Sequence, residues 1–99
     1  MPEVDVQLTV WQAEWCPHSA KIRERLTELM VPFVAMPVEP ESADRSALQD
    51  ATGQNCIPAL VFADGTVLAG DDETILSGLD ARFSEGPEAK GHRVKDAEH

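Results

Sequence analysis

A chain of 99 residues, 42% of them hydrophobic and only 5% aromatic, has room for a single small core and hence for one folded domain. Eighteen acidic residues against eight basic ones give a formal net charge of −10, which repels nucleic-acid phosphates and anionic lipids. No apolar run approaches the roughly 18 residues that span a membrane, and the acidic N-terminus is unlike a signal peptide. We therefore expect a cytoplasmic monomer that binds neither nucleic acid nor membrane.

The first half of the chain predicts a strand, a helix and a second strand. Apolar and polar residues alternate over residues 4–11, as in a strand with one buried face. Over residues 16–30 the apolar spacing fits one face of a helix, which Pro32 prevents from continuing. A short apolar strand over residues 33–35 leads into a loop over residues 37–41, whose prolines exclude both a helix and a central strand.

The second half predicts a weak helix, a hairpin and a closing helix. Ser42 can cap a helix that ends at Gly53 and has few apolar contacts. An Asp-Gly pair lies between apolar runs at residues 59–62 and 66–69, which is typical of two strands joined by a tight turn.

Acidic residues at 71–73 favour the start of a third helix, whose buried stripe ends at Phe83. Residues 84–99 contain a single sizeable aliphatic residue, so we expect a disordered tail after a domain that spans residues 1–83. The element order βαβαββα predicts an α/β domain with a four-stranded mixed sheet and three helices, placed on both faces of the sheet.

The sequence Trp15-Cys16-Pro17-His18-Ser19 lies at the turn from the first strand into the first helix. Unpaired amide donors and the positive end of the helix dipole at this position stabilise a thiolate over a thiol. Such a site can lower the pKa of a cysteine from about 8.5 into the range of about 3.5–7.5. Cys16 is therefore the candidate nucleophile.

Residues 15–19 resemble the active-site motif of the thioredoxin superfamily, with serine in place of the second cysteine. Residues 48–62 are similar to the glutaredoxin segment that leads through Thr-Gly-Gln to a cis-proline, and the Asp-Gly turn and residues 70–72 match that family's hairpin and acidic helix start. The similarity covers residues 4–83 in order. It implies a thioredoxin-like fold of the glutaredoxin type with a monothiol Cys-Pro-His-Ser motif.

The resemblance also implies the roles of individual residues. The backbone beside a cis-proline pairs with the peptide of the small thiol, and the acidic helix start binds its other end. The catalytic residues would be Cys16, Pro17, His18 and Ser19, and the residues that bind the thiol would be Trp15, Ile57, Pro58, Asp71 and Asp72. At the helix start the family's register also allows Glu73 and Thr74, and we favour Asp71 and Asp72.

Two positions differ from common glutaredoxins. Ala13 stands where many members have a lysine that meets a substrate carboxylate, and Trp15 is more reminiscent of thioredoxins. Gln12, Lys21 or Arg45 could substitute as partner of a carboxylate. The net charge of −10 itself disfavours an anionic thiol such as glutathione.

Several side chains have a structural alternative to a chemical role. Cys56 is expected to pack as a small hydrophobic residue rather than to resolve a disulfide. His18 is either a solvated helix residue or a cation beside the thiolate, and Ser19 is either an ordinary residue of the first helical turn or a donor to that thiolate. The histidines and cysteines show no zinc-ligand spacing, so we expect no metal site.

These residues indicate a monothiol thiol-disulfide oxidoreductase. Cys16 would act on mixed disulfides of proteins with a small thiol, and glutathione or another low-molecular-weight thiol would be co-substrate, with no bound cofactor. One alternative is a non-catalytic thiol-binding module similar to the N-terminal domain of glutathione transferases. Another is an iron–sulfur carrier, which Pro17 disfavours because monothiol glutaredoxins of that kind have glycine at this position.

Overall fold

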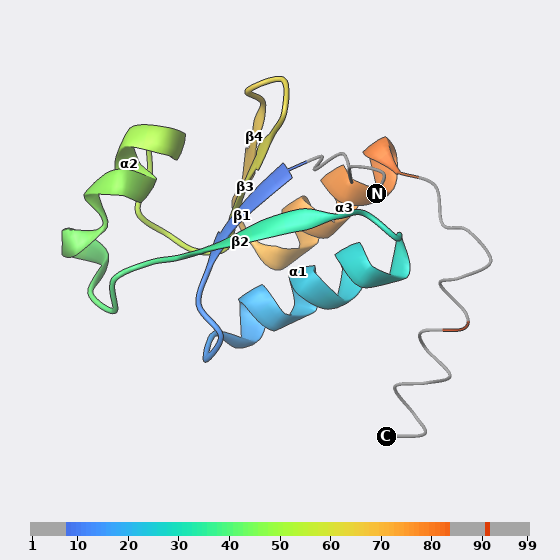
Figure 1. The fold of residues 1–99 in the computed structure, drawn as a ribbon, viewed down its shortest axis with the longest axis horizontal. Coiled ribbons are helices and arrows are strands. Elements are labelled where there is room, and N and C mark those ends of the chain that lie inside the picture. Colours follow the sequence, from blue (N-terminus) through green and yellow to red (C-terminus); the bar gives the residue numbers. More distant parts are fainter. Residues whose placement is uncertain (1–7, 84–90, 92–99) are drawn as a thin grey trace, which may run out of the picture.

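A four-stranded sheet forms the centre of the computed structural model, which describes residues 8–83 and residue 91 (Figure 1). The strands lie side by side in the order β2-β1-β3-β4. β1 runs parallel to β2 and antiparallel to β3, and β3 runs antiparallel to β4. The sheet is therefore mixed, as predicted. The strand bounds are Leu8–Gln12 for β1, Phe33–Pro37 for β2, Ala59–Phe62 for β3 and Val67–Ala69 for β4.

Three α-helices accompany this sheet: α1 over Pro17–Glu28, α2 over Ser46–Thr52 and α3 over Asp72–Arg82. The element order βαβαββα is confirmed, with one additional short 3₁₀ helix over Ser42–Asp44. α1 and α3 lie next to each other on one face of the sheet, whereas α2 lies to the side of the other elements (Figure 1). No helix in the described part of the chain is long and apolar enough to cross a bilayer.

The main core lies between the sheet and the two neighbouring helices. The apolar stripe predicted for α1 is buried through Ile22 and Leu26, and that of α3 through Ile75 and Leu79. Full burial of one such side chain contributes about 1.5–3 kcal/mol to folding. This core fixes the N-terminal ends of α1 and α3, where the candidate site residues lie. The strand residues that complete the core are Leu8, Val10, Leu60 and Phe62.

The opposite face of the sheet is only partly covered. More than one-third of the surface is exposed at Val34, Met36 and Val67. The residues that pair with them on the neighbouring strands lie on the same face of the sheet. α2 contacts β3 but leaves the outer strands open on this side. The expectation of helices on both faces therefore holds for one face in full and for the other in part.

The predicted helix over residues 42–53 is wrong in its first part. The chain forms the 3₁₀ turn, then breaks at Arg45, whose φ of −87° and ψ of 59° are not helical. α2 begins only at Ser46, and Glu41 rather than Ser42 precedes the 3₁₀ turn. The predicted end is correct, because Gly53 has a φ of 80° and closes α2 in the left-handed conformation that glycine permits.

The remaining differences concern the ends of elements. β2 extends to Pro37, which we placed in a loop; proline is tolerated there because β2 is an edge strand. α1 ends at Glu28, two residues before the predicted end, and Met30 then takes a φ of 58°. Residues 4–7 of the predicted first strand and the predicted tail at 84–99, except residue 91, lie outside the described residues, so the boundary between domain and tail stays a prediction.

We predict unequal costs for substitutions on the two faces of the sheet. Leu60→Ala empties a fully buried position of the core and is expected to lower the free energy of unfolding by about 2–5 kcal/mol. Val34→Ala, on the open face, is expected to cost less than about 1 kcal/mol. Urea denaturation of both variants measures these values. Equal losses would mean that the open face is covered in solution.

Candidate active site

Cys16 is the N-cap residue of α1, four residues after the end of β1. Its amide donates a hydrogen bond to the Ala13 carbonyl (3.1 Å), and its own carbonyl accepts one from Ala20 (3.1 Å). Pro17 occupies the first helical position, where its missing N–H costs nothing. The turn between strand and helix thus places the Cys16 side chain, only 5% exposed, over the free amides of the first turn.

Opposing effects act on the pKa of the Cys16 thiol. Burial raises this pKa and is the largest single contribution. Hydrogen bonds from the Ser19 side chain and from the backbone N–H groups of Ser19 and His18 lower it, while the nearby Asp72 carboxylate raises it. The hydrogen bonds prevail, so the pKa of Cys16 lies below its ordinary value. A larger fraction of the thiol is therefore the nucleophilic thiolate at a given pH.

Ser19 is fully buried and connects Cys16 to the preceding turn. Its Oγ accepts a hydrogen bond from the Ala13 amide (3.5 Å), so its hydroxyl hydrogen is available to the Cys16 sulfur. Of the two alternatives left open for Ser19, this geometry favours the donor to the thiolate. A serine cannot form a disulfide, so the position can stabilise the thiolate but cannot resolve a mixed disulfide.

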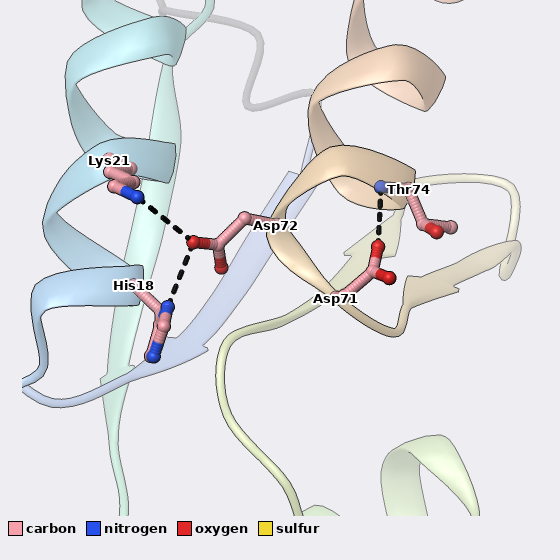
Figure 2. A network of polar contacts seen from close by, with 5 residues as sticks. All are labelled: His18, Lys21, Asp71, Asp72 and Thr74. Carbon is pink, nitrogen blue, oxygen red and sulfur yellow. Dashed lines mark hydrogen bonds and ion pairs between the residues drawn. The ribbon is translucent and has the colours of Figure 1, made fainter.

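His18 is directed toward α3 (Figure 2). Its Nδ1 lies 2.8 Å from Oδ2 of Asp72, and Nζ of Lys21 donates to the same oxygen at 3.3 Å. The hydrogen bond from His18, followed by that from Lys21, lowers the pKa of the Asp72 carboxyl despite some opposing desolvation. Asp72 therefore joins the side chains of His18 and Lys21, on the first turns of α1, to the start of α3.

Asp71 caps α3. Its Oδ1 accepts a hydrogen bond from the Thr74 amide at 2.8 Å, as Figure 2 shows. Hydrogen bonds from Thr74 lower the pKa of the Asp71 carboxyl, so this carboxylate is charged at neutral pH. The predicted acidic helix start is thus present, with Asp71 as the N-cap and Asp72 as the first residue of α3.

A cavity of about 460 Å³ lies between these elements. The predicted cis peptide between Ile57 and Pro58 is confirmed, and both residues line the cavity. Gly70, which matched the family's helix start but was given no role at the site, also lines it, with a φ of 128° that disfavours any side chain. The complete lining is His18, Ile57, Pro58, Gly70, Asp71, Asp72 and Glu73.

Arg45 supports the loops next to this cavity. Its side chain is 7% exposed and donates to the backbone carbonyls of Glu39 (2.7 Å), Pro40 (3.0 Å) and Asn55 (3.0 Å). The guanidinium therefore joins the segment after β2 to the segment before the cis-proline. A buried arginine without a carboxylate was not recognisable from sequence, because its acceptors are backbone atoms.

Cys56 is exposed, so the expectation that it packs as a small hydrophobic residue is wrong. The Gln54 side chain accounts for this placement. It accepts from the Cys56 amide at 3.2 Å and donates to the Cys56 carbonyl at 2.9 Å, which holds the segment before Pro58 in a loop at the surface.

The other predicted residues differ in their positions. Trp15 is 67% exposed and does not line the cavity. Pro17 begins α1 and is exposed. Among the described residues, no group of three His, Cys, Asp or Glu side chains could hold a metal ion.

Each of the three side chains that could bind a carboxylate of the substrate already contacts other groups of the protein. Gln12 is buried, donates to Glu14 and accepts from Arg23. Lys21 pairs with Asp72, and Arg45 bonds backbone carbonyls.

Replacement of the buried serine tests its role as donor. We predict that Ser19→Ala raises the pKa of Cys16, because the thiolate loses one hydrogen bond while burial is unchanged. The pH dependence of iodoacetamide alkylation gives the midpoint. Ser77→Ala, at an exposed position of α3, is the matched control and should leave the midpoint unchanged. An unchanged midpoint in Ser19→Ala would contradict the assignment.

Solved structures similar to this chain share its fold. A glutathione transferase homologue from Sulfitobacter with bound glutathione superposes with a TM-score of 0.68 at 20% identity, over 87% of this chain and 40% of its own. Glutaredoxin 2 from Salmonella typhimurium, in complex with glutathione, gives 0.63 at 17% identity, over 77% and 34%. A thioredoxin-like protein mutant gives 0.61 at 24% identity, over 76% and 91%. The fold is therefore thioredoxin-like.

Sequence comparison identifies the family. A chloroplastic glutaredoxin, C4 of rice (Oryza sativa subsp. japonica), is 34% identical over 71 residues, which are 69% of this chain and 53% of that protein. The chain thus spans about half the length of this curated relative. The glutaredoxin family model matches residues 6–68, from the first strand to the hairpin. The chain belongs to the glutaredoxin family.

Proposed function

We propose that this chain is a monothiol thiol-disulfide oxidoreductase that acts on mixed disulfides between proteins and a small thiol. The observation that supports this most is the environment of Cys16, a buried N-cap thiol whose pKa is lowered by hydrogen bonds from the first turn of α1. Because the fourth position of the motif is Ser19, the second thiol of the cycle must come from outside the motif.

In the first step the Cys16 thiolate attacks the sulfur of the small thiol in the mixed disulfide. The bond between that sulfur and the protein sulfur breaks, and the protein leaves as a thiolate that takes a proton from water. Cys16 then carries the small thiol as a new disulfide. Hydrogen bonds from Ser19 and the amides of α1 stabilise Cys16 as the attacking group here and as the leaving group in the next step.

In the second step the thiolate of another small-thiol molecule attacks the disulfide on Cys16, at the sulfur of the small thiol that Cys16 carries. A symmetric small-molecule disulfide forms and the Cys16 thiolate is released, so electrons and atoms balance over the cycle. The cycle therefore needs a compartment with a pool of reduced small thiol, and the cytoplasm is our expectation.

The cavity supplies the groups that would hold the small thiol. Ile57 and Pro58 offer backbone groups at one wall, and Asp71 and Asp72 offer carboxylates at another. Trp15, exposed beside Cys16, would contact the protein part of the substrate. Glutathione is a candidate thiol, since the family relationship and the glutathione-bound similar structures both support it.

A non-catalytic thiol-binding module is the main alternative, because this chain superposes on part of a glutathione transferase homologue. The two functions differ in one property. A module that only binds would not form a covalent adduct at Cys16, whereas the exchange cycle requires one.

We predict that the oxidised protein accumulates as a mixed disulfide on Cys16. After treatment with oxidised small thiols, intact mass should show one added thiol in wild type and in Cys56→Ala, and peptide mapping should place it on Cys16. Cys16→Ser in the Cys56→Ala background is the thiol-free control. Turnover of Cys56→Ala should equal that of wild type.

Two results would contradict the monothiol cycle. A loss of two hydrogens in wild type with no adduct would make Cys56 the resolving residue. The absence of any covalent change would favour the binding module.

A further inference from the structure

The ring of His18 is held at one nitrogen and open at the other. Its Nδ1 lies 2.8 Å from Oδ2 of Asp72, whereas Nε2 points away from that carboxylate (Figure 2). No group in the described part of the chain forms a hydrogen bond with Nε2. The Asp72 carboxyl has a lowered pKa and is ionised at neutral pH, so it can only accept a hydrogen bond. A neutral His18 therefore carries its proton on Nδ1 and presents the lone pair of Nε2, as a base does.

His18 also lies where a thiol held in the cavity would meet Cys16. Its side chain is 59% exposed and lines the cavity with Ile57 and Pro58, the residues proposed to hold the small thiol. Its backbone N–H donates to the Cys16 sulfur, and through this N–H His18 lowers the pKa of the thiol. The ring is directed to Asp72 instead, which leaves Nε2 for a different partner.

The second step of the proposed cycle has a use for a base at this place. Cys16 needs none in the first step, because hydrogen bonds already lower its pKa. The incoming small thiol has no such hydrogen bonds in solution, and an ordinary thiol is only a few per cent ionised at pH 7. A base that removes its proton during the attack would therefore accelerate the release of Cys16.

We propose that His18 is the general base for the incoming small thiol in the second step, and that Asp72 is the residue that positions its ring. This inference rests on the proposed exchange at Cys16 and adds a proton acceptor to it. The arrangement has the three parts of a base-assisted nucleophile: the thiol in the cavity, the imidazole that takes its proton, and the carboxylate that fixes the tautomer.

The step balances in protons and electrons. Nε2 of His18 takes the S–H proton while the thiol sulfur bonds to the small-thiol sulfur of the disulfide on Cys16. The bond between that sulfur and Cys16 breaks, and Cys16 leaves as a thiolate. The positive charge on the ring faces Asp72 until His18 gives the proton to water, which offsets the proton that the protein thiolate took from water in the first step.

Release of a mixed disulfide on Cys16 tests the base. Full-length Cys56→Ala is loaded with bis(2-hydroxyethyl) disulfide, and mass spectrometry of acid-quenched samples follows its release by 2-mercaptoethanol at pH 7. We expect His18→Gln to slow release about tenfold, because the few per cent of thiolate in solution still reacts without the base. Loading is the reverse reaction and should slow by the same factor. Alkylation of Cys16 by iodoacetamide, which needs no base for an incoming thiol, should change less than about twofold.

A thiol that is already ionised is the matched control within the same variant. 4-Nitrothiophenol is a thiolate at pH 7, so its release of the same mixed disulfide should be nearly equal in wild-type and His18→Gln backgrounds. A defect in the shape of the cavity would slow both thiols instead.

Asp72→Asn tests the positioning residue. The variant should slow release by 2-mercaptoethanol about twofold or more, because the carboxylate that fixes the tautomer of His18 is lost. Alkylation of Cys16 should not slow, since the Asp72 charge raises the pKa of that thiol and its removal favours the thiolate. A parallel loss of both rates would contradict the assignment of Asp72.

The failures of the two proposals are distinguishable. Unchanged release by 2-mercaptoethanol in His18→Gln, or equal slowing with 4-nitrothiophenol, would overturn the role of His18 while the exchange at Cys16 stands. If bis(2-hydroxyethyl) disulfide loads no thiol onto Cys16 of the Cys56→Ala protein, the proposed exchange itself is wrong, and the role of His18 is lost with it.

Discussion

The hydrogen bonds that converge on the Cys16 sulfur from the first turn of α1 are the interaction on which the site depends. Burial of the thiol works against its ionisation, so the thiolate is favoured only while the Ser19 hydroxyl and the two backbone amides stay directed at it. Their positions are set by the turn from β1 into α1. The apolar core, through which α1 and its neighbour α3 pack on the sheet, holds that turn in place.

The start of α3 adds a second constraint of opposite sign. Asp72 contacts both His18 and Lys21, and its carboxylate still raises the pKa of Cys16. The side chains of His18 and Lys21 are therefore directed to a carboxylate at the start of α3. The pKa of Cys16 is lowered instead by hydrogen bonds, first that of the Ser19 side chain and then those of the backbone N–H groups of Ser19 and His18.

Local patterns were sufficient to predict most of the fold. The hairpin at residues 59–69 and the buried stripe of α1 follow from short-range signals, and the cis-proline follows from the resemblance to glutaredoxins. The interruption of the helix at Arg45 was not predictable, since the Arg45 side chain bonds three carbonyls that only the folded loops bring together. Cys56 was misassigned for a similar reason, because the Gln54 side chain holds its backbone at the surface.

The candidate site, like the fold, could be predicted only in part. The motif and the acidic helix start could be located by their residues, and the structure brings His18, Pro58 and Asp71 to one cavity. The groups that the basic side chains contact could not be predicted. From the sequence, Lys21 and Arg45 could equally bind a carboxylate of the substrate. In the structure Lys21 contacts Asp72, 51 residues away, and Arg45 bonds backbone carbonyls at most 10 residues away.

The central claim is that Cys16 is ionised more readily than an ordinary cysteine because of its place at the start of α1. The ¹³Cβ chemical shift of selectively labelled Cys16 reports its ionisation directly when it is followed as a function of pH. The account predicts a midpoint below the ordinary value of about 8.5. A midpoint at or above that value would show that burial and Asp72 outweigh the hydrogen bonds, and the proposed nucleophile would be lost.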